Sequence, residues 1–99
     1  MAESDPVQEK RDRKRDLITV PVSYSYSIQE QGQIKSFTMN GISLNVSDTG
    51  VCFYTHIRLE DGTALNVYGR ALWDGARKGN VQWCRKITEG LFRVGVQLL

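Results

Sequence analysis

The sequence predicts an all-β fold, a small antiparallel (split) β-barrel of six to seven strands that follows a flexible N-terminal tail. Three observations support it. Apolar and polar residues alternate in several short runs, which is the period of a half-buried strand. Turn residues separate these runs at near-regular intervals, and no run has the apolar period of a helix. Closing such a sheet buries its apolar face and removes exposed edges.

The chain of 99 residues is long enough for one domain with a single core. Residues 1–9 have the composition of a disordered leader, because they offer almost nothing to bury. Residues 10–99 are expected to form the one barrel domain, including a basic segment at its start. The net charge of +2 is too small for indiscriminate nucleic-acid binding, but five of the thirteen Lys and Arg lie in residues 10–15.

The first predicted strand begins at Leu17. Its apolar face carries alternate residues: Ile18, Val20, Val22, Tyr24, Tyr26 and Ile28. Pro21 has no N–H for a ladder, so it indicates an edge or a bulge. A hairpin turn is predicted at 29–33, where Gly32 suits the turn.

The second strand is predicted in two parts, 34–38 and 42–46, with a bulge or second turn at 39–41. In its later part Ile42, Leu44 and Val46 are expected to point one way. Asn45 and Ser47 then share the opposite, polar face. A turn follows at 47–50, and Gly50 is suited to a positive φ or to close approach of a ligand.

The remaining elements follow the same two signals. Strands are predicted at 51–57 and at 64–73. Another strand is predicted from Val81 onward, with Val81 and Trp83 both pointing inward. The last strand is predicted to bury Phe92, Val94, Val96 and Leu98. Turn signals stand at 60–62, 74–75, 78–80 and 89–90.

Several function classes are disfavoured by what the sequence lacks. It has no signal-peptide-like or membrane-spanning apolar run, which predicts a cytoplasmic protein without a membrane span. Cys52 and Cys84 lack metal-site or redox spacing and are expected to be reduced and packed. His56 stands alone, so no metal site is predicted. No nucleophile, base and orienting group form a credible set, so we expect neither an enzyme nor a cofactor.

Two polar constellations stand out against this framework. Arg11-x-x-x-Arg15 precedes the first strand, and Asn45-x-Ser47-x-x-Gly50 ends the second. Taken alone, the first is more typical of a solvated charged leader, and the second of an ordinary turn. Their occurrence in this order on a barrel of this length is a more specific signal.

Together these motifs resemble the PilZ domain family, whose members are bacterial receptors for the second messenger cyclic di-GMP. The family signature is Arg-x-x-x-Arg followed by Asp/Asn-x-Ser-x-x-Gly, and the match here spans Arg11 to Gly50. The stretches 79–83 and 92–96 look like the family's last two strands. The spacing from Arg15 to Asn45 is at the long end, and Asp16 is an additional neighbour that can pair with an arginine.

The resemblance implies a set of ligand contacts. Arg11 and Arg15 would close over the nucleotide, Asn45 and Ser47 would hydrogen-bond it, and Gly50 would let the backbone approach it. Arginine suits this ligand because its planar fork bonds guanine or phosphate bidentately and stacks on purines.

Two more basic residues, Lys10 and Arg13, are secondary contacts that raise the local potential. In the family, the residue at the position of Lys10 bears on whether one ligand or an intercalated pair is bound, and the stoichiometry stays open here.

The resulting hypothesis is a cyclic di-GMP receptor without catalysis, which signals to an unidentified protein partner in motility, biofilm formation or exopolysaccharide control. One alternative is a small barrel that binds single-stranded nucleic acid through a basic groove and exposed aromatic residues. Most aromatic residues fall on faces predicted to be buried, which disfavours that alternative. A second alternative is a ligand-free, PilZ-like adaptor for other proteins.

Overall fold

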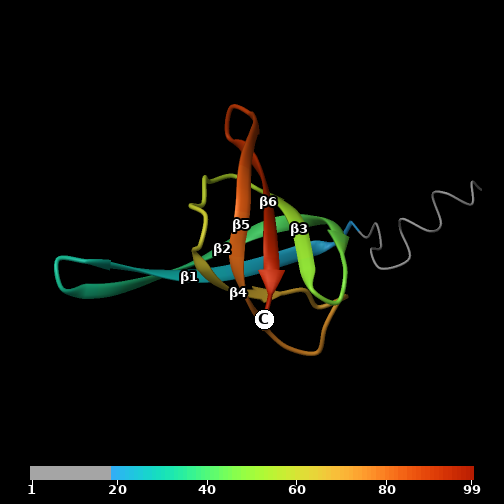
Figure 1. The fold of residues 1–99 in the computed structure, drawn as a ribbon, viewed down its shortest axis with the longest axis horizontal. Coiled ribbons are helices and arrows are strands. Elements are labelled where there is room, and N and C mark those ends of the chain that lie inside the picture. The colour runs from blue at the N-terminus through green and yellow to red at the C-terminus, as the bar shows by residue number, and fades with distance from the viewer. Residues whose placement is uncertain (1–18) are drawn as a thin grey trace, which may run out of the picture.

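The computed structural model describes residues 19–99, which form six strands and no helix. The strands are β1 (Pro21–Glu30), β2 (Gln33–Val46), β3 (Gly50–Thr55), β4 (Ala64–Tyr68), β5 (Arg77–Thr88) and β6 (Leu91–Leu98). They close into a barrel in the order β1-β2-β3-β6-β5-β4, and every neighbouring pair is antiparallel (Figure 1). The predicted fold class is therefore confirmed. The predicted leader, the tail and Leu17 lie outside the described residues.

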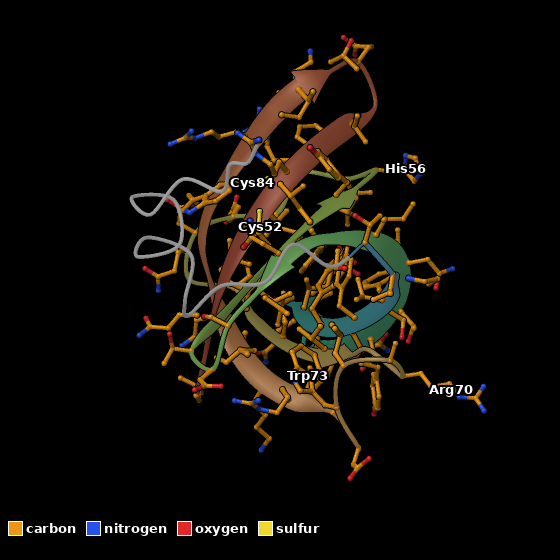
Figure 2. All side chains as sticks on the ribbon, turned by 90° about the vertical axis from the view of Figure 1, so that its right-hand side faces the viewer. Cys52, His56, Arg70, Trp73 and Cys84 are labelled. Carbon is orange, nitrogen blue, oxygen red and sulfur yellow. The ribbon has the colours of Figure 1, made fainter. Side chains whose placement is uncertain are left out.

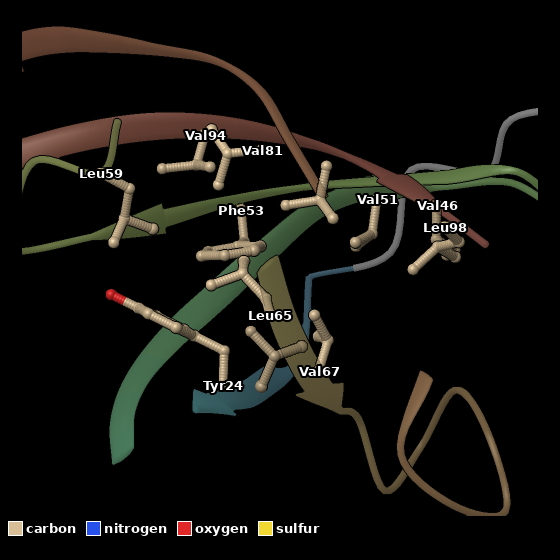
Figure 3. Packing of buried hydrophobic residues seen from close by; sticks show 12 residues of the cluster. Tyr24, Val46, Val51, Phe53, Leu59, Leu65, Val67, Val81, Val94 and Leu98 are labelled. Carbon is tan, nitrogen blue, oxygen red and sulfur yellow. The ribbon is translucent and has the colours of Figure 1, made fainter. Parts of the chain in front are cut away.

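The core fills the interior of this barrel with side chains from all six strands (Figure 3). Tyr24 and Phe53 are fully buried at its centre, with ring centroids 5.1 Å apart. Each large apolar side chain buried in this way contributes about 1.5–3 kcal/mol to the gross driving force. The Tyr24 hydroxyl shares a 2.6 Å hydrogen bond with Oγ1 of buried Thr55. Burial raises the pKa of Tyr24 above its ordinary value of 10.0, although the bond to Thr55 opposes the shift.

The β1–β2 hairpin continues well beyond the barrel as a two-stranded arm, which we define as residues 26–37 (Figure 1). Its tip is the predicted hairpin turn, made by Gln31 and Gly32 with φ values of 52° and 77°. The prediction that Ile28 is buried is wrong, because this residue lies on the arm and is 40% exposed. Pro21 is the first residue of β1, a position that a strand proline tolerates.

The predicted interruption of β2 at 39–41 is wrong, since the strand pairs with β1 without a break. Gly41 instead marks a close approach between strands. A Cβ atom there would lie 2.5 Å from the carbonyl oxygen of Tyr54 on β3.

The irregularity of β2 comes later, as a bulge between Ser43 and Asn45. The bulge changes which side chains face inward. Ser43 is only 1% exposed, whereas Ile42, which was expected to point the same way as Val46, is 51% exposed. Val46 returns to the core after the bulge, as predicted.

Two later boundaries also differ from prediction. β4 ends at Tyr68, not at Trp73, because the chain turns where Leu72 and Trp73 donate backbone hydrogen bonds to Gly69 O. The predicted turn at 78–80 belongs to β5. Its glycine, Gly79, is a second close approach, because a Cβ atom there would lie 2.6 Å from Gln97 O.

A second bulge lies in β5, between Val81 and Trp83. It makes two consecutive residues oppose one on β6, so Val81 stays in the core while Trp83 turns to the outer surface. The prediction that Trp83 points inward is therefore wrong. The predicted turns at 60–62 and 89–90 are confirmed by positive φ values at Gly62 and Gly90.

Candidate functional site

The outer surface of β2, β3, β6 and β5 carries a depression of about 350 Å³. Asn45, Ser47 and Gly50 all line it, so the fold brings the second sequence motif together at one place. Trp83 and Gln97 line it as well. We call this surface the outer face.

Strand register arranges the residues of the outer face in rows. Residues directly opposite in an antiparallel pair point to the same side of the sheet. One row joins Cys52, Gly95 and Trp83, and the next joins Tyr54, Arg93 and Arg85. Gly95 is required here, because a Cβ atom at this position would collide with the Trp83 indole. The indole can therefore lie across the strand beside it.

Two arginines flank that indole. The Cζ atoms of Arg85 and Arg93 lie 5.1 and 6.0 Å from the centroid of the Trp83 ring, within the range of cation–π attraction. The two guanidinium groups come from directly opposite residues, an arrangement of like charges that destabilises a bare sheet. Arg93 Nε is buried and has no hydrogen-bond partner among the described residues. This cluster of donors and positive charge suits an anion beside an aromatic plane.

Ser47 also holds the turn at the rim of the depression. Its N–H donates to Gly50 O at 2.8 Å, while its Oγ accepts from Thr49 N at 3.3 Å. Leu98 N donates to Thr49 O at 2.9 Å and ties this turn to β6. Gly50 does not have the positive φ that the sequence suggested. A Cβ atom at Gly50 would instead lie 3.2 Å from Val96 O, so glycine permits the close approach of β6.

The first motif cannot be located in this way. Arg11 and Arg15, with the secondary contacts Lys10 and Arg13, lie outside the described residues. Sequence reasoning missed Trp83, Arg85 and Arg93 as members of the outer face, because the β5 bulge reverses the expected alternation. One signal was available: Gly95 interrupts an alternating apolar strand, which often marks the close approach of another group.

Among the described residues, the two cysteines and His56 do not gather into one site, and His56 lies apart from both cysteines (Figure 2). Cys52 and Cys84 are reduced, Cys52 on the outer face and Cys84 packed against the core. His56 is exposed, and its Nδ1 lies 3.1 Å from Gly90 O. Within residues 19–99 no three His, Cys, Asp or Glu side chains gather where they can bind a metal. The same part of the chain has no helix of the length and apolarity that crossing a membrane requires.

Comparison with known proteins gives a likeness to a solved structure. No protein-family model matches the chain, and no curated protein sequence does. Among solved structures, the inhibitor of motility of Bacillus subtilis (MotI/DgrA) aligns with a TM-score of 0.56 and 12% sequence identity. The alignment covers 86% of this chain and 40% of that protein. At this identity the likeness shows a shared fold, and the aligned part of the chain spans about two fifths of the length of its neighbour.

Proposed function

We propose that this protein is a PilZ-like receptor that binds cyclic di-GMP on the outer face and passes the signal to a protein partner. The observation that carries the proposal is the cluster formed by Trp83, Arg85 and Arg93 beside Asn45 and Ser47. It supplies an aromatic plane, two cations and hydrogen-bonding side chains on one surface.

Each part of the cluster matches a part of the ligand. A guanine base stacks on Trp83, and the guanidinium groups of Arg85 and Arg93 neutralise a phosphate. Asn45 and Ser47 hydrogen-bond the nucleotide at the rim. Arg11 and Arg15 bond guanine or phosphate from the N-terminal segment, as the family resemblance implies. An anion between Arg85 and Arg93 also relieves their mutual repulsion and gives Arg93 Nε a partner.

The proposed cellular role is drawn from the structural neighbour. The structural neighbour is by its title an inhibitor of motility, which agrees with a role in motility control. We infer that the protein acts in the bacterial cytoplasm without catalysis or a cofactor, and that its downstream partner is a protein. A ligand-free adaptor function requires none of the contacts described above.

A second candidate function is favoured by one observation. Trp83 faces outward between two arginines, whereas the sequence placed it in the core. Trp83 is half-buried, and an aromatic ring at the surface beside cations is also how single-stranded nucleic acid is bound, one base on each ring. That function predicts affinity for oligonucleotides and little selectivity for a cyclic dinucleotide.

Titration calorimetry separates these functions. Cyclic di-GMP, GTP and a short single-stranded oligonucleotide are titrated into the full chain under one salt condition, since phosphate contacts depend on salt. We expect heat from cyclic di-GMP only. Tight oligonucleotide binding without a cyclic di-GMP signal favours the nucleic-acid function. If none of the three compounds gives heat, the result favours the ligand-free adaptor function.

Variants then test the assignment of the site. Arg15→Ala and Arg93→Gln are each expected to weaken cyclic di-GMP binding by about tenfold or more, because each removes a charged hydrogen bond of about 1.5–3 kcal/mol. Arg70→Ala is the matched control, because Arg70 is an exposed arginine that lies away from the outer face (Figure 2). Normal binding by both site variants contradicts the assignment.

A further inference from the structure

The arm leaves two strand edges unpaired. β1 pairs with β4 only from Ser23 to Ser25, and β2 pairs with β3 only from Ile42 onward. Between these points and the turn at the tip, each strand of the arm has its partner on one side alone (Figure 1). An unpaired edge of this kind is a template for another strand.

The outward backbone groups of β2 follow from the ladder. Ser43 N donates to Val20 O at 2.9 Å, which makes these two residues a hydrogen-bonded pair. Hydrogen-bonded and non-hydrogen-bonded pairs alternate in an antiparallel ribbon, and the β1–β2 register has no shift. The N–H and C=O groups that point away from β1 therefore belong to Ile34, Ser36, Thr38 and Asn40.

This edge has few of the features that keep strand edges apart. Natural edges are blocked by charges, prolines or bulges. Within residues 21–42 the only charged side chains are Glu30 and Lys35, and they pair with each other at 3.2 Å. The only proline of residues 21–42, Pro21, lies at the end of β1 that is far from the tip of the arm. The arm is thus neutral, so it neither attracts a charged partner nor repels another arm.

We propose that the arm is a dimerisation element, in which β2 pairs antiparallel with β2 of a second copy about a twofold axis at Phe37. In this register Phe37 faces Phe37 of the second copy, and Ser36 faces Thr38. Lys35 faces Met39, whose apolar side chain accepts the lysine stem. Aromatic pairs and hydroxyl pairs are among the favourable cross-strand contacts. The strand edge is therefore complementary to itself.

An aromatic row extends from the core to this axis. Ring centroids are separated by 5.1 Å from Phe53 to Tyr24, by 6.3 Å from Tyr24 to Tyr26, and by 5.4 Å from Tyr26 to Phe37. Phe37 at the end of the row is 38% exposed. The dimer joins the rows of two copies and covers their outer rings. This inference is independent of the proposed ligand.

The test uses a matched pair of proline substitutions in the full chain. Ser36 and Ser27 are direct partners across the arm, and their hydroxyl groups share a 2.9 Å hydrogen bond. Ser36→Pro and Ser27→Pro both remove this hydrogen bond between side chains. Both keep the backbone hydrogen bonds between β1 and β2, because the backbone N–H groups of Ser27 and Ser36 point away from the partner strand. Only Ser36→Pro blocks the β2 edge.

Sedimentation velocity over a concentration series gives the readout. We expect the parent and Ser27→Pro to dimerise, and the dissociation constant of Ser36→Pro to be at least tenfold higher. A parent that stays monomeric, or equal weakening by both prolines, overturns the proposal. Circular dichroism checks that each variant is folded.

A cross-link decides the question if Ser36→Pro does not fold. At the axis, Phe37 and its counterpart form a non-hydrogen-bonded pair with Cα atoms about 4.5 Å apart, within disulfide range. Phe37→Cys is therefore expected to give a covalent dimer on mild oxidation. Ile28→Cys is the control, because Ile28 is equally exposed on the other strand of the arm. Equal cross-linking by both, or none by Phe37→Cys, overturns the proposal.

Discussion

Tyr24 is a buried residue whose hydroxyl is hydrogen-bonded to Thr55. The ring is fully buried between Phe53 and Tyr26, and the hydroxyl reaches Thr55 Oγ1 at 2.6 Å. Because burial disfavours the phenolate, the pKa of Tyr24 is raised from 10.0 in the folded state. The residue therefore links core packing to the pH dependence of stability.

The sign of that dependence follows from the direction of the shift. Below about pH 10 the tyrosine is protonated in both states. Above it, the unfolded chain releases its proton before the folded protein does, so the unfolding free energy falls until the folded-state pKa is passed. In denaturant titrations between about pH 8 and pH 11, the unfolding free energies of the parent and of Tyr24→Phe are expected to converge, because the parent loses more stability than the variant as the pH rises.

The same variant has an expected cost at neutral pH. Tyr24→Phe leaves the buried Thr55 hydroxyl without this partner, which destabilises the fold by about 1–3 kcal/mol. The double variant Tyr24→Phe/Thr55→Val removes both hydroxyls and is expected to recover part of that loss. An unchanged stability of Tyr24→Phe at neutral pH contradicts the account.

At the scale of the element, the arm extends from the barrel and contributes little to the stability of the barrel. Residues 27–38 are all exposed, and the polar contacts within the arm, Ser27–Ser36 and Lys35–Glu30, are exposed as well. Exposed contacts of this kind contribute about 0–1 kcal/mol each. The stability of the barrel therefore comes from elsewhere.

Shortening the arm tests this view. In the shortened variant, Asn-Gly replaces residues 27–36 and joins Tyr26 directly to Phe37. The rings of these two residues stack with centroids 5.4 Å apart, and their backbones form a hydrogen-bonded pair, which a two-residue turn can close. We expect the unfolding free energy to change by less than about 1 kcal/mol, because only exposed residues are lost. A loss of several kcal/mol in thermal or denaturant unfolding shows that the arm supports the core.

Bulges limited what the sequence predicted about the elements. Alternation located the six strands, since each has one buried face, and the hairpin turn at Gly32 was found from its residue type. The bulges near Leu44 and Gln82 depend on the register with a partner strand far along the chain, so a local pattern does not reveal them. Glycines caused a related error, because Gly41 and Gly79 suggested turns but permit close approach.

The candidate site was predicted in part for the same reason. Asn45 and Ser47 lie after the β2 bulge, where the alternation resumes, and they do share the outer face. Trp83 was predicted to face inward, and the one-residue bulge in β5 places it on the outer face instead. Arg85 and Arg93 become neighbours only through β5–β6 pairing, which the sequence does not specify.

At the scale of the whole molecule, the strand pairs that close the barrel differ in length, and we call each such pair a seam. β1 and β4 pair through three residues on each strand, whereas β3 and β6 pair through six. β4 is also the shortest strand and pairs with β5 through only four residues. Local opening is easiest where the fewest hydrogen bonds and contacts must break.

Native-state hydrogen exchange is expected to reveal this order. We expect amides of β4 to exchange at least tenfold faster than those of β3 and of the paired part of β6, because the β1–β4 seam opens without disrupting the β3–β6 core. The comparison is best made between buried Val67 and Val94, which are equally covered in the closed barrel. Equal protection of the two valines indicates that the barrel opens as one unit.

The outward turn of Trp83 also has an optical consequence. The chain contains two tryptophans, and Trp83 alone lines the depression on the outer face. A base stacked on the indole of Trp83 quenches its fluorescence. Trp73 lies in the β4–β5 connection, where Arg77 of β5 packs over its ring, and it gives a constant fluorescence background. Trp73→Phe removes that background and leaves a protein whose intrinsic fluorescence reports directly on whether the outer face is occupied.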